Sequence, residues 1–128
     1  MKYLLDTHIL LWSASEPGKL SKAAQKLIGN LEHSLYFSAV SLWEIAIKNG
    51  LGRADFSVDP AALRRGLLDN GYEELSISGQ HAVAVNNLPN LHKDPFDRML
   101  IAQAQLEGIT LLTADEAVTQ YKGPIKKI

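Results

Sequence analysis

The chain has 128 residues, the length of one ordinary domain, so we expect a single domain over residues 1–128. It contains no cysteine, which excludes disulfides, thiolate zinc sites and cysteine nucleophiles. Thirteen lysines and arginines against fourteen aspartates and glutamates give a formal net charge of −1, which argues against a protein that holds nucleic acid by bulk positive charge.

The amino-terminal segment reaches a carboxylate, Asp6, too early for the apolar stretch of a signal peptide. No apolar run approaches the roughly 20 residues that a membrane span needs. We therefore expect a soluble, cytoplasmic protein that has no membrane partner.

Short apolar runs, which predict buried strands, alternate with amphipathic segments, which predict helices. In chain order we expect strand 3–5, helix 9–12, helix 21–31, strand 35–37, helix 39–51, helix 60–70, strand 74–77, helix 78–85, helix 94–107, strand 109–112, helix 115–121 and an edge strand 125–128. The segments 53–59 and 88–93 are expected to be loops. Strands separated by helices predict an α/β fold, a three-layer α/β/α sandwich with a central parallel sheet of four to five short strands.

Two aspartates follow predicted strands. Asp6 directly ends the first strand, and Asp115 lies three residues beyond Leu112, the last apolar residue of the fourth. In a parallel sheet both would lie at the same rim, where α/β proteins bind their ligands. An aspartate at a strand end can also cap the helix that follows, and the sequence leaves both roles open.

The central polar residues of helix 39–51 lie in one narrow stripe. Ser41, Glu44 and Lys48 follow one another at spacings of three and four. Apolar residues occupy nearly all of the remaining circumference, so we expect the helix to be largely buried; they are Val40, Leu42, Trp43, Ile45, Ala46, Ile47 and Leu51. Either Glu44 and Lys48 form a surface ion pair, or Glu44 faces a polar cleft.

The segment from Asp94 to Ala104 begins with a favourable helix start, because Asp94 precedes a proline at the first helical position. Asp97 falls in the first turn and shares a face with apolar residues, which are Leu100, Ile101 and Ala104. A carboxylate on such a face is costly unless a positive group meets it. Arg98 points about 100° away around the helix, so a metal ion is the better candidate.

Four carboxylates, on Asp6, Glu44, Asp97 and Asp115, can thus converge at one rim of the sheet. Together they would repel one another, and a divalent cation would relieve that repulsion. Oxygen ligands suit Mg²⁺ or Mn²⁺. Thr113 can hold Asp115 or a bound water through its hydroxyl. Of the four histidines His8 is nearest to this rim in sequence, and the other three show no metal-ligand spacing among themselves.

Four segments in this order resemble the PIN domain, and specifically the bacterial VapC-like toxins that carry a DPFDR sequence. The matching segments are LLDTH at 4–8, SAVSLWEIAIK at 38–48, HKDPFDRMLIAQA at 92–104 and LTAD at 112–115. The resemblance covers essentially the whole chain. It implies a Mg²⁺- or Mn²⁺-dependent endoribonuclease that hydrolyses RNA phosphodiester bonds with metal-activated water.

By motif, Asp6, Glu44 and Asp97 match the core acids of the family. Asp115 matches its more variable fourth acid and Thr113 the accompanying hydroxyl, while Asp94 and Ser41 are possible supporting residues. The resemblance also implies a homodimer, inhibited by a small VapB-like antitoxin that wraps the toxin and places a basic side chain in the acidic site. The candidate phosphate contacts are Lys48, Arg53, Arg64, Arg65 and Arg98.

Two other functions are weighed against this one. A haloacid-dehalogenase-like phosphatase needs a second acid two residues after its first strand-end aspartate, where this chain has His8. A PIN-like module that binds RNA or protein without cleavage would usually have lost acids from the cluster, and this chain retains four.

Overall fold

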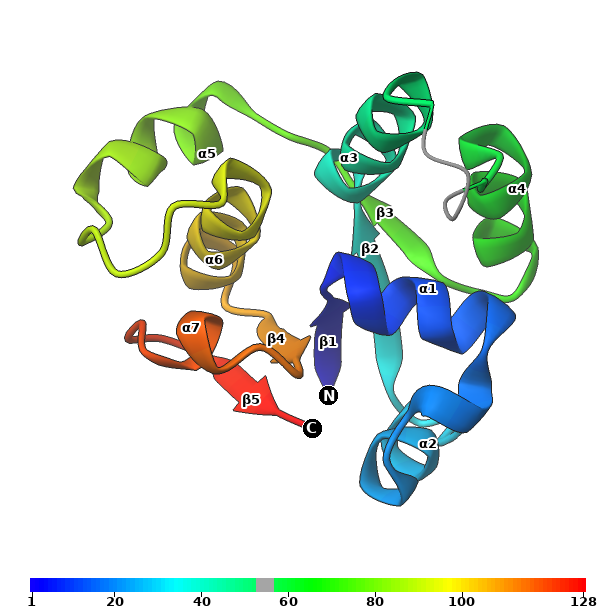
Figure 1. Ribbon diagram of the computed structural model, residues 1–128. Coiled ribbons are helices and arrows are strands. Elements are labelled where there is room, and N and C mark those ends of the chain that lie inside the picture. Colours follow the sequence, from blue (N-terminus) through cyan, green and yellow to red (C-terminus); the bar gives the residue numbers. More distant parts are fainter. Residues whose placement is uncertain (53–56) are drawn as a thin grey trace.

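The structure, a computed structural model, describes residues 1–52 and 57–128. Most of the expected loop 53–59, including Arg53, lies outside these described residues. A five-stranded, fully parallel sheet in the order β3-β2-β1-β4-β5 forms the centre (Figure 1). Its strands are β1 Lys2–Leu5, β2 Ser34–Ser38, β3 Glu73–Leu75, β4 Thr110–Thr113 and β5 Ile125–Lys127. The α/β fold and the parallel sheet expected from the sequence are confirmed.

Helices connect these strands and cover both faces of the sheet (Figure 1). The α-helices are α1 Thr7–Ser15, α2 Lys22–Ile28, α3 Ala39–Gly50, α4 Pro60–Asp69, α5 Gly79–Ala84, α6 Pro95–Glu107 and α7 Glu116–Thr119. Two short 3-10 turns, η1 Pro17–Lys19 and η2 Val85–Asn87, follow α1 and α5. No helix within the described residues is long and apolar enough to cross a membrane.

Alternation along β1 divides the interior into two cores. Leu4 points into a core built mainly from α6, β4 and α7, whereas Tyr3 and Leu5 point to the opposite face. The second core contains side chains of α1, α2 and α4, namely Ile9, Leu10, Ala24 and Leu67. Side chains on successive strand residues face opposite sides of the sheet. A sheet covered on both faces therefore needs apolar residues at odd and at even positions of a strand. This explains why the strands read as unbroken apolar runs.

Several elements differ from the sequence expectation at their ends: helix 9–12 is α1 at 7–15, strand 74–77 is β3 at 73–75, and helix 115–121 is α7 at 116–119. Two further helices differ in ways that affect the surface. Helix α2 ends at Ile28 rather than at 31, and Leu31 is 99% exposed. The expectation that α3 is largely buried is wrong for one side, because Trp43 is 58% and Leu51 66% exposed. The apolar pattern of α3 therefore includes a stripe that faces away from the core.

The parallel register brings the carboxyl ends of the central strands together. Leu5 pairs with Leu112, and the Asp6 N–H donates to the Leu112 carbonyl at 3.1 Å. The residues that follow β1 and β4 consequently lie at one rim. Helices α3 and α6 begin near this rim and bring in the remaining acids.

Candidate metal centre

Three aspartates of the site each cap a helix. The Asp6 Oδ1 accepts the N–H of Ile9 at the start of α1, at 2.9 Å. Asp115 caps α7, and Asp94 caps α6 through two backbone N–H groups at 2.8 and 3.1 Å. The capping role that the sequence left open is therefore confirmed. It also fixes each carboxylate, since an N-cap side chain is held by the helix that it begins.

Thr113 links the ends of β1 and β4. Its Oγ1 accepts the backbone N–H of Asp115 at 3.0 Å, and its hydroxyl hydrogen-bonds the Asp6 carboxylate. The expected hold of Thr113 on Asp115 is thus present, through the main chain. Asp115 Oδ1 accepts a hydrogen bond from the N–H of Ala117 at 2.8 Å. Its other oxygen, Oδ2, is therefore the one that can contact a ligand in the site.

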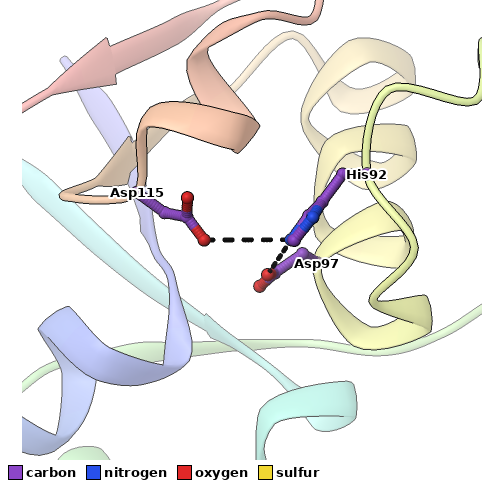
Figure 2. A group of neighbouring side chains, drawn as sticks. All are labelled: His92, Asp97 and Asp115. Carbon is purple, nitrogen blue, oxygen red and sulfur yellow. Dashed lines mark hydrogen bonds and ion pairs between the residues drawn. The ribbon is translucent and has the colours of Figure 1, made fainter.

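His92, Asp97 and Asp115 converge from three directions (Figure 2). His92 Nε2 lies 2.8 Å from Asp97 Oδ2 and 3.8 Å from Asp115 Oδ2. One donor atom from each residue lies within 4.8 Å of the other two, which is the spacing of ligands around one metal ion. The sequence analysis missed His92, although a signal was available, since the residue stands two positions before the aspartate that caps the site helix.

Glu44 is placed differently from the other acids. Its carboxylate is buried, and its Oε2 accepts a hydrogen bond from Lys48 at 2.7 Å, so the expected Glu44–Lys48 pair exists at a buried position. Its Oε1 is buried and has no hydrogen-bond partner among the described residues. One turn earlier Ser41 accepts a hydrogen bond from Thr7, the neighbour of Asp6, at 2.9 Å. The polar stripe of α3 therefore faces the start of α1.

Burial raises the pKa of the Asp97 carboxyl to about 6. The hydrogen bond to His92 opposes this rise, while the negative charges of Asp94 and Asp6 add to it. Burial also raises the pKa of the Asp6 carboxyl, against hydrogen bonds from Thr113 and the backbone. Neighbouring carboxylates in a partly dry site thus keep one another from ionising freely.

The loop that carries His92 is held by Arg98 of α6 and by Tyr121, which follows α7. The Arg98 guanidinium donates to the carbonyls of Val85, Leu88, Pro89 and His92, at 3.0 to 3.4 Å. It also donates to the Tyr121 hydroxyl at 3.0 Å. Arg98 was expected as a candidate phosphate contact, and in the structure its two terminal nitrogens bond the loop and Tyr121.

Other cations of the expected set are also engaged. Lys48 pairs with Glu44, as described above, and Arg64 forms a two-pronged contact with Glu74 at 2.6 and 3.1 Å. Arg65 is exposed. His8, the histidine nearest to the rim in sequence, is exposed and lies against Trp12.

The donor set fits a divalent cation. Carboxylate oxygens come from the ends of β1 and β4 and the first turn of α6. Burial raises the pKa values of Asp6 and Asp97, so a positive partner would favour their ionised forms. The buried Glu44 Oε1 is a further acceptor that has no hydrogen-bond partner among the described residues. Oxygen-rich donor sets of this kind suit Mg²⁺ or Mn²⁺.

Comparison with known proteins agrees with this arrangement. The chain is 28% identical over 122 residues to "Ribonuclease VapC22" of Mycobacterium tuberculosis, covering 94% of this chain and 92% of that protein. It superposes on a chain of the VapBC2 complex of Rickettsia felis bound to promoter DNA, with a TM-score of 0.74, 14% identity and coverage of 100% and 99%. For the DNA-bound VapBC of Salmonella typhimurium the TM-score is 0.67, at 17% identity and coverage of 99% and 98%. The PIN domain family model matches residues 3–124, and the chain therefore belongs to the PIN domain family.

Proposed function

We propose that this chain is a Mg²⁺- or Mn²⁺-dependent endoribonuclease and the toxin of a VapBC-type toxin–antitoxin pair. The observation that carries the proposal is the cluster of His92, Asp97 and Asp115, in which one ligand atom of each lies within 4.8 Å of the other two. Asp6 lies close enough for its negative charge to contribute to the raised pKa of Asp97. A curated relative named as a ribonuclease supports the reaction, because it matches the chain over nearly its whole length.

In this proposal Asp6, Glu44, Asp97 and Asp115 hold the metal, with Thr113, Asp94 and Ser41 in support. When bound, the ion lowers the pKa of a water and stabilises charge on the phosphoryl and leaving oxygens. Asp115 suits the role of proton acceptor better than Glu44, because its side chain is 43% exposed whereas that of Glu44 is 5% exposed and tied to Lys48. A proton taken up by Asp115 can pass directly to solvent.

Cleavage of RNA is the direct test. Purified wild-type chain should cut a mixed pool of transfer, ribosomal and messenger RNA with Mg²⁺ or Mn²⁺ and not with EDTA. Asp6→Asn should lose activity by about a hundredfold or more, because asparagine can still cap α1 but carries no charge for the ion. Asp69→Asn is the matched control, since this exposed carboxylate lies on α4 and should leave activity unchanged.

Two results would contradict the nuclease proposal. Equal cutting by the wild type, by Asp6→Asn and in EDTA would assign the activity to a contaminant. A wild type that cuts none of the RNA classes yet binds them would favour the alternative, a PIN-like module that binds RNA or protein without cleavage.

The toxin role is checked in cells. Expression of the wild type in bacteria should arrest growth, because unrestrained RNA cleavage halts protein synthesis. Asp6→Asn, at an equal level of protein measured by immunoblot, should not arrest growth. Growth arrest by both forms would show that the toxicity does not depend on the acid cluster, and would contradict this part of the proposal.

A VapB-like antitoxin is the proposed partner. A groove of about 910 Å³ lies between α1 and α4, with Ser13, Leu35 and Leu63 in its lining. Helix α1 begins beside Asp6 and reaches this groove about 10 Å further along. A groove with both polar and apolar lining residues, near an acidic cluster, suits an amphipathic segment that carries a basic side chain. A peptide of this kind should inhibit cleavage, and Leu63→Asp should weaken that inhibition.

We also infer a homodimer. The stripe of α3 formed by Trp43, Ile47 and Leu51 is exposed by 58%, 39% and 66%. An exposed apolar stripe of this kind is typical of an association surface, and a second copy of the chain is the occupant that the resemblance to VapC-like toxins implies. Light scattering should give twice the mass of one chain for the wild type and the mass of one chain for Ile47→Glu.

A further inference from the structure

We propose that His92 is a metal ligand through its Nε2 atom, so that the centre is a mixed nitrogen–oxygen site rather than an all-carboxylate one. This inference rests on the proposed function, because it concerns the same metal. It assigns to the loop before α6 a direct part in the site. The inference changes the expected metal preference and makes the loop, not only the strand ends and helices, part of the catalytic machinery.

The distances around Nε2 suit a shared ion. Two ligand atoms bound about 2.1 Å from one ion lie about 3 Å apart when adjacent and about 4.2 Å apart when opposite. Nε2 lies 2.8 Å from an oxygen of Asp97 and 3.8 Å from an oxygen of Asp115, so both separations fit ligands of one ion within a few tenths of an ångström. Figure 2 shows the imidazole edge directed at both carboxylates.

The backbone of His92 is anchored on both sides, so its ring is held in place. Its N–H donates to the Tyr121 hydroxyl at 2.9 Å, and the N–H of Leu91 donates to the same oxygen at 3.2 Å. Its carbonyl accepts from Arg98 at 3.4 Å. Four hydrogen bonds from the Arg98 guanidinium to backbone carbonyls and further bonds to the Tyr121 hydroxyl hold this short segment. Such anchoring gives a ligand the fixed position that metal sites need.

A second observation points to a ligand independently of the acids in Figure 2. The Glu44 Oε1 atom is buried and unpartnered among the described residues, on the stripe of α3 that faces the start of α1. A buried carboxylate oxygen of this kind calls for a hydrogen-bond donor or an ion, beyond the Lys48 ammonium that the other oxygen of Glu44 accepts from. The polar stripe of α3 therefore adds an acceptor on the side of α1, while the cluster that could hold one ion consists of His92, Asp97 and Asp115.

The competing role is a plain hydrogen bond. With its proton on Nε2, His92 donates to Asp97 and only orients the carboxylate. With its proton on Nδ1, Nε2 presents a lone pair to the ion. The two roles predict different metal preferences, because imidazole nitrogen favours Co²⁺ and Ni²⁺ over Mg²⁺ whereas carboxylates alone do so less.

The variant His92→Gln separates the two roles. The glutamine amide keeps an N–H donor within reach of Asp97 but has no imidazole nitrogen for the ion. His33→Ala is the matched control. His33 directly precedes β2, so it lies at the amino-terminal rim of the sheet, opposite to the rim that carries the site. Circular dichroism melting curves check that each variant is folded.

The measurement is pulsed electron paramagnetic resonance of the full chain loaded with Mn²⁺. The wild type and His33→Ala should show ¹⁴N coupling from one directly bound imidazole, and His92→Gln should not. In calorimetric titrations His92→Gln should lower the affinity for Co²⁺ by about tenfold or more and that for Mg²⁺ by less than about threefold.

Failure of this inference can be told apart from failure of the proposed function. If wild-type chain binds Mn²⁺ and Asp97→Asn does not, yet no ¹⁴N coupling appears, His92 is not a ligand and the nuclease proposal stands. Coupling that persists in His92→Gln also overturns the inference. If the wild type binds no Mn²⁺, both the inference and the metal dependence fall.

Discussion

Replacing Asp97 with asparagine is expected to abolish RNA cleavage and, at the same time, to raise the free energy of unfolding of the metal-free protein at pH 7. Burial and the charges of Asp94 and Asp6 raise the pKa of the Asp97 carboxyl to about 6. The folded chain therefore carries this carboxylate at pH 7 against its environment. Asparagine keeps a similar shape and an oxygen for His92 but has no charge.

The direction of the pH dependence follows from the raised pKa. The carboxyl binds its proton more tightly in the folded chain, at about 6, than in the unfolded chain, at 3.8. The folded state binds more protons between these values, so the free energy of unfolding falls as pH rises through this window and stays low above it. The difference corresponds to about 3 kcal/mol at most, since one pKa unit is about 1.4 kcal/mol.

Urea unfolding in EDTA at several pH values between 4 and 8 measures this effect. The wild type should lose stability between about pH 4 and pH 6, and Asp97→Asn should lose much less. A residual slope remains because burial also raises the pKa of Asp6. Asp69→Asn, an exposed carboxylate on α4, should follow the wild type within about 0.5 kcal/mol.

Adding metal should reverse the order of the wild type and Asp97→Asn in free energy of unfolding. Mg²⁺ should raise the free energy of unfolding of the wild type by an amount that grows with the ratio of its concentration to its Kd. It should raise that of Asp97→Asn far less. An Asp97→Asn protein that is less stable than the wild type in EDTA at pH 7 would show that the carboxylate is not under electrostatic strain. Such a result would remove the main physical reason to place a cation beside it.

The helix starts of this site were readable from the sequence because capping is local. Asp94 before Pro95 predicts the start of α6, and the structure confirms it through two hydrogen bonds from backbone N–H groups. Asp6 and Asp115 could be placed at one rim because parallel strands end on the same side. These inferences need only a few neighbouring residues and the direction of the sheet.

The remaining features depend on contacts between distant segments. The spacing of the histidines among themselves does not distinguish His92. Its position two residues before Asp94 is a signal, but a loop residue has no periodicity that reveals where its side chain points. Trp43 and Leu51 were expected in the core because they are apolar, yet they are exposed. Apolar character alone does not separate a core residue from one on an association surface.

Arg98→Ala is expected to lower the free energy of unfolding by about 2–4 kcal/mol and to free the loop that carries His92. The side chain makes five hydrogen bonds, four of them to backbone carbonyls between Val85 and His92. Alanine leaves these acceptors without the donor that orders them, and hydrogen bonds to a charged group contribute about 1.5–3 kcal/mol each, although their contributions do not add. Lysine should rescue little, because a single ammonium cannot replace the planar fork.

Arg64→Ala is the matched control for Arg98→Ala. Both arginines make two-pronged contacts, but Arg64 lies half exposed on α4 and pairs with a single carboxylate, Glu74. Exposed pairs of this kind contribute little to stability, because water and salt screen them. Hydrogen exchange should therefore rise over residues 85–93 in Arg98→Ala and stay unchanged there in Arg64→Ala. Equal stability of the two variants would mean that the loop holds its shape without Arg98, and that His92 is positioned by Tyr121 and the site itself.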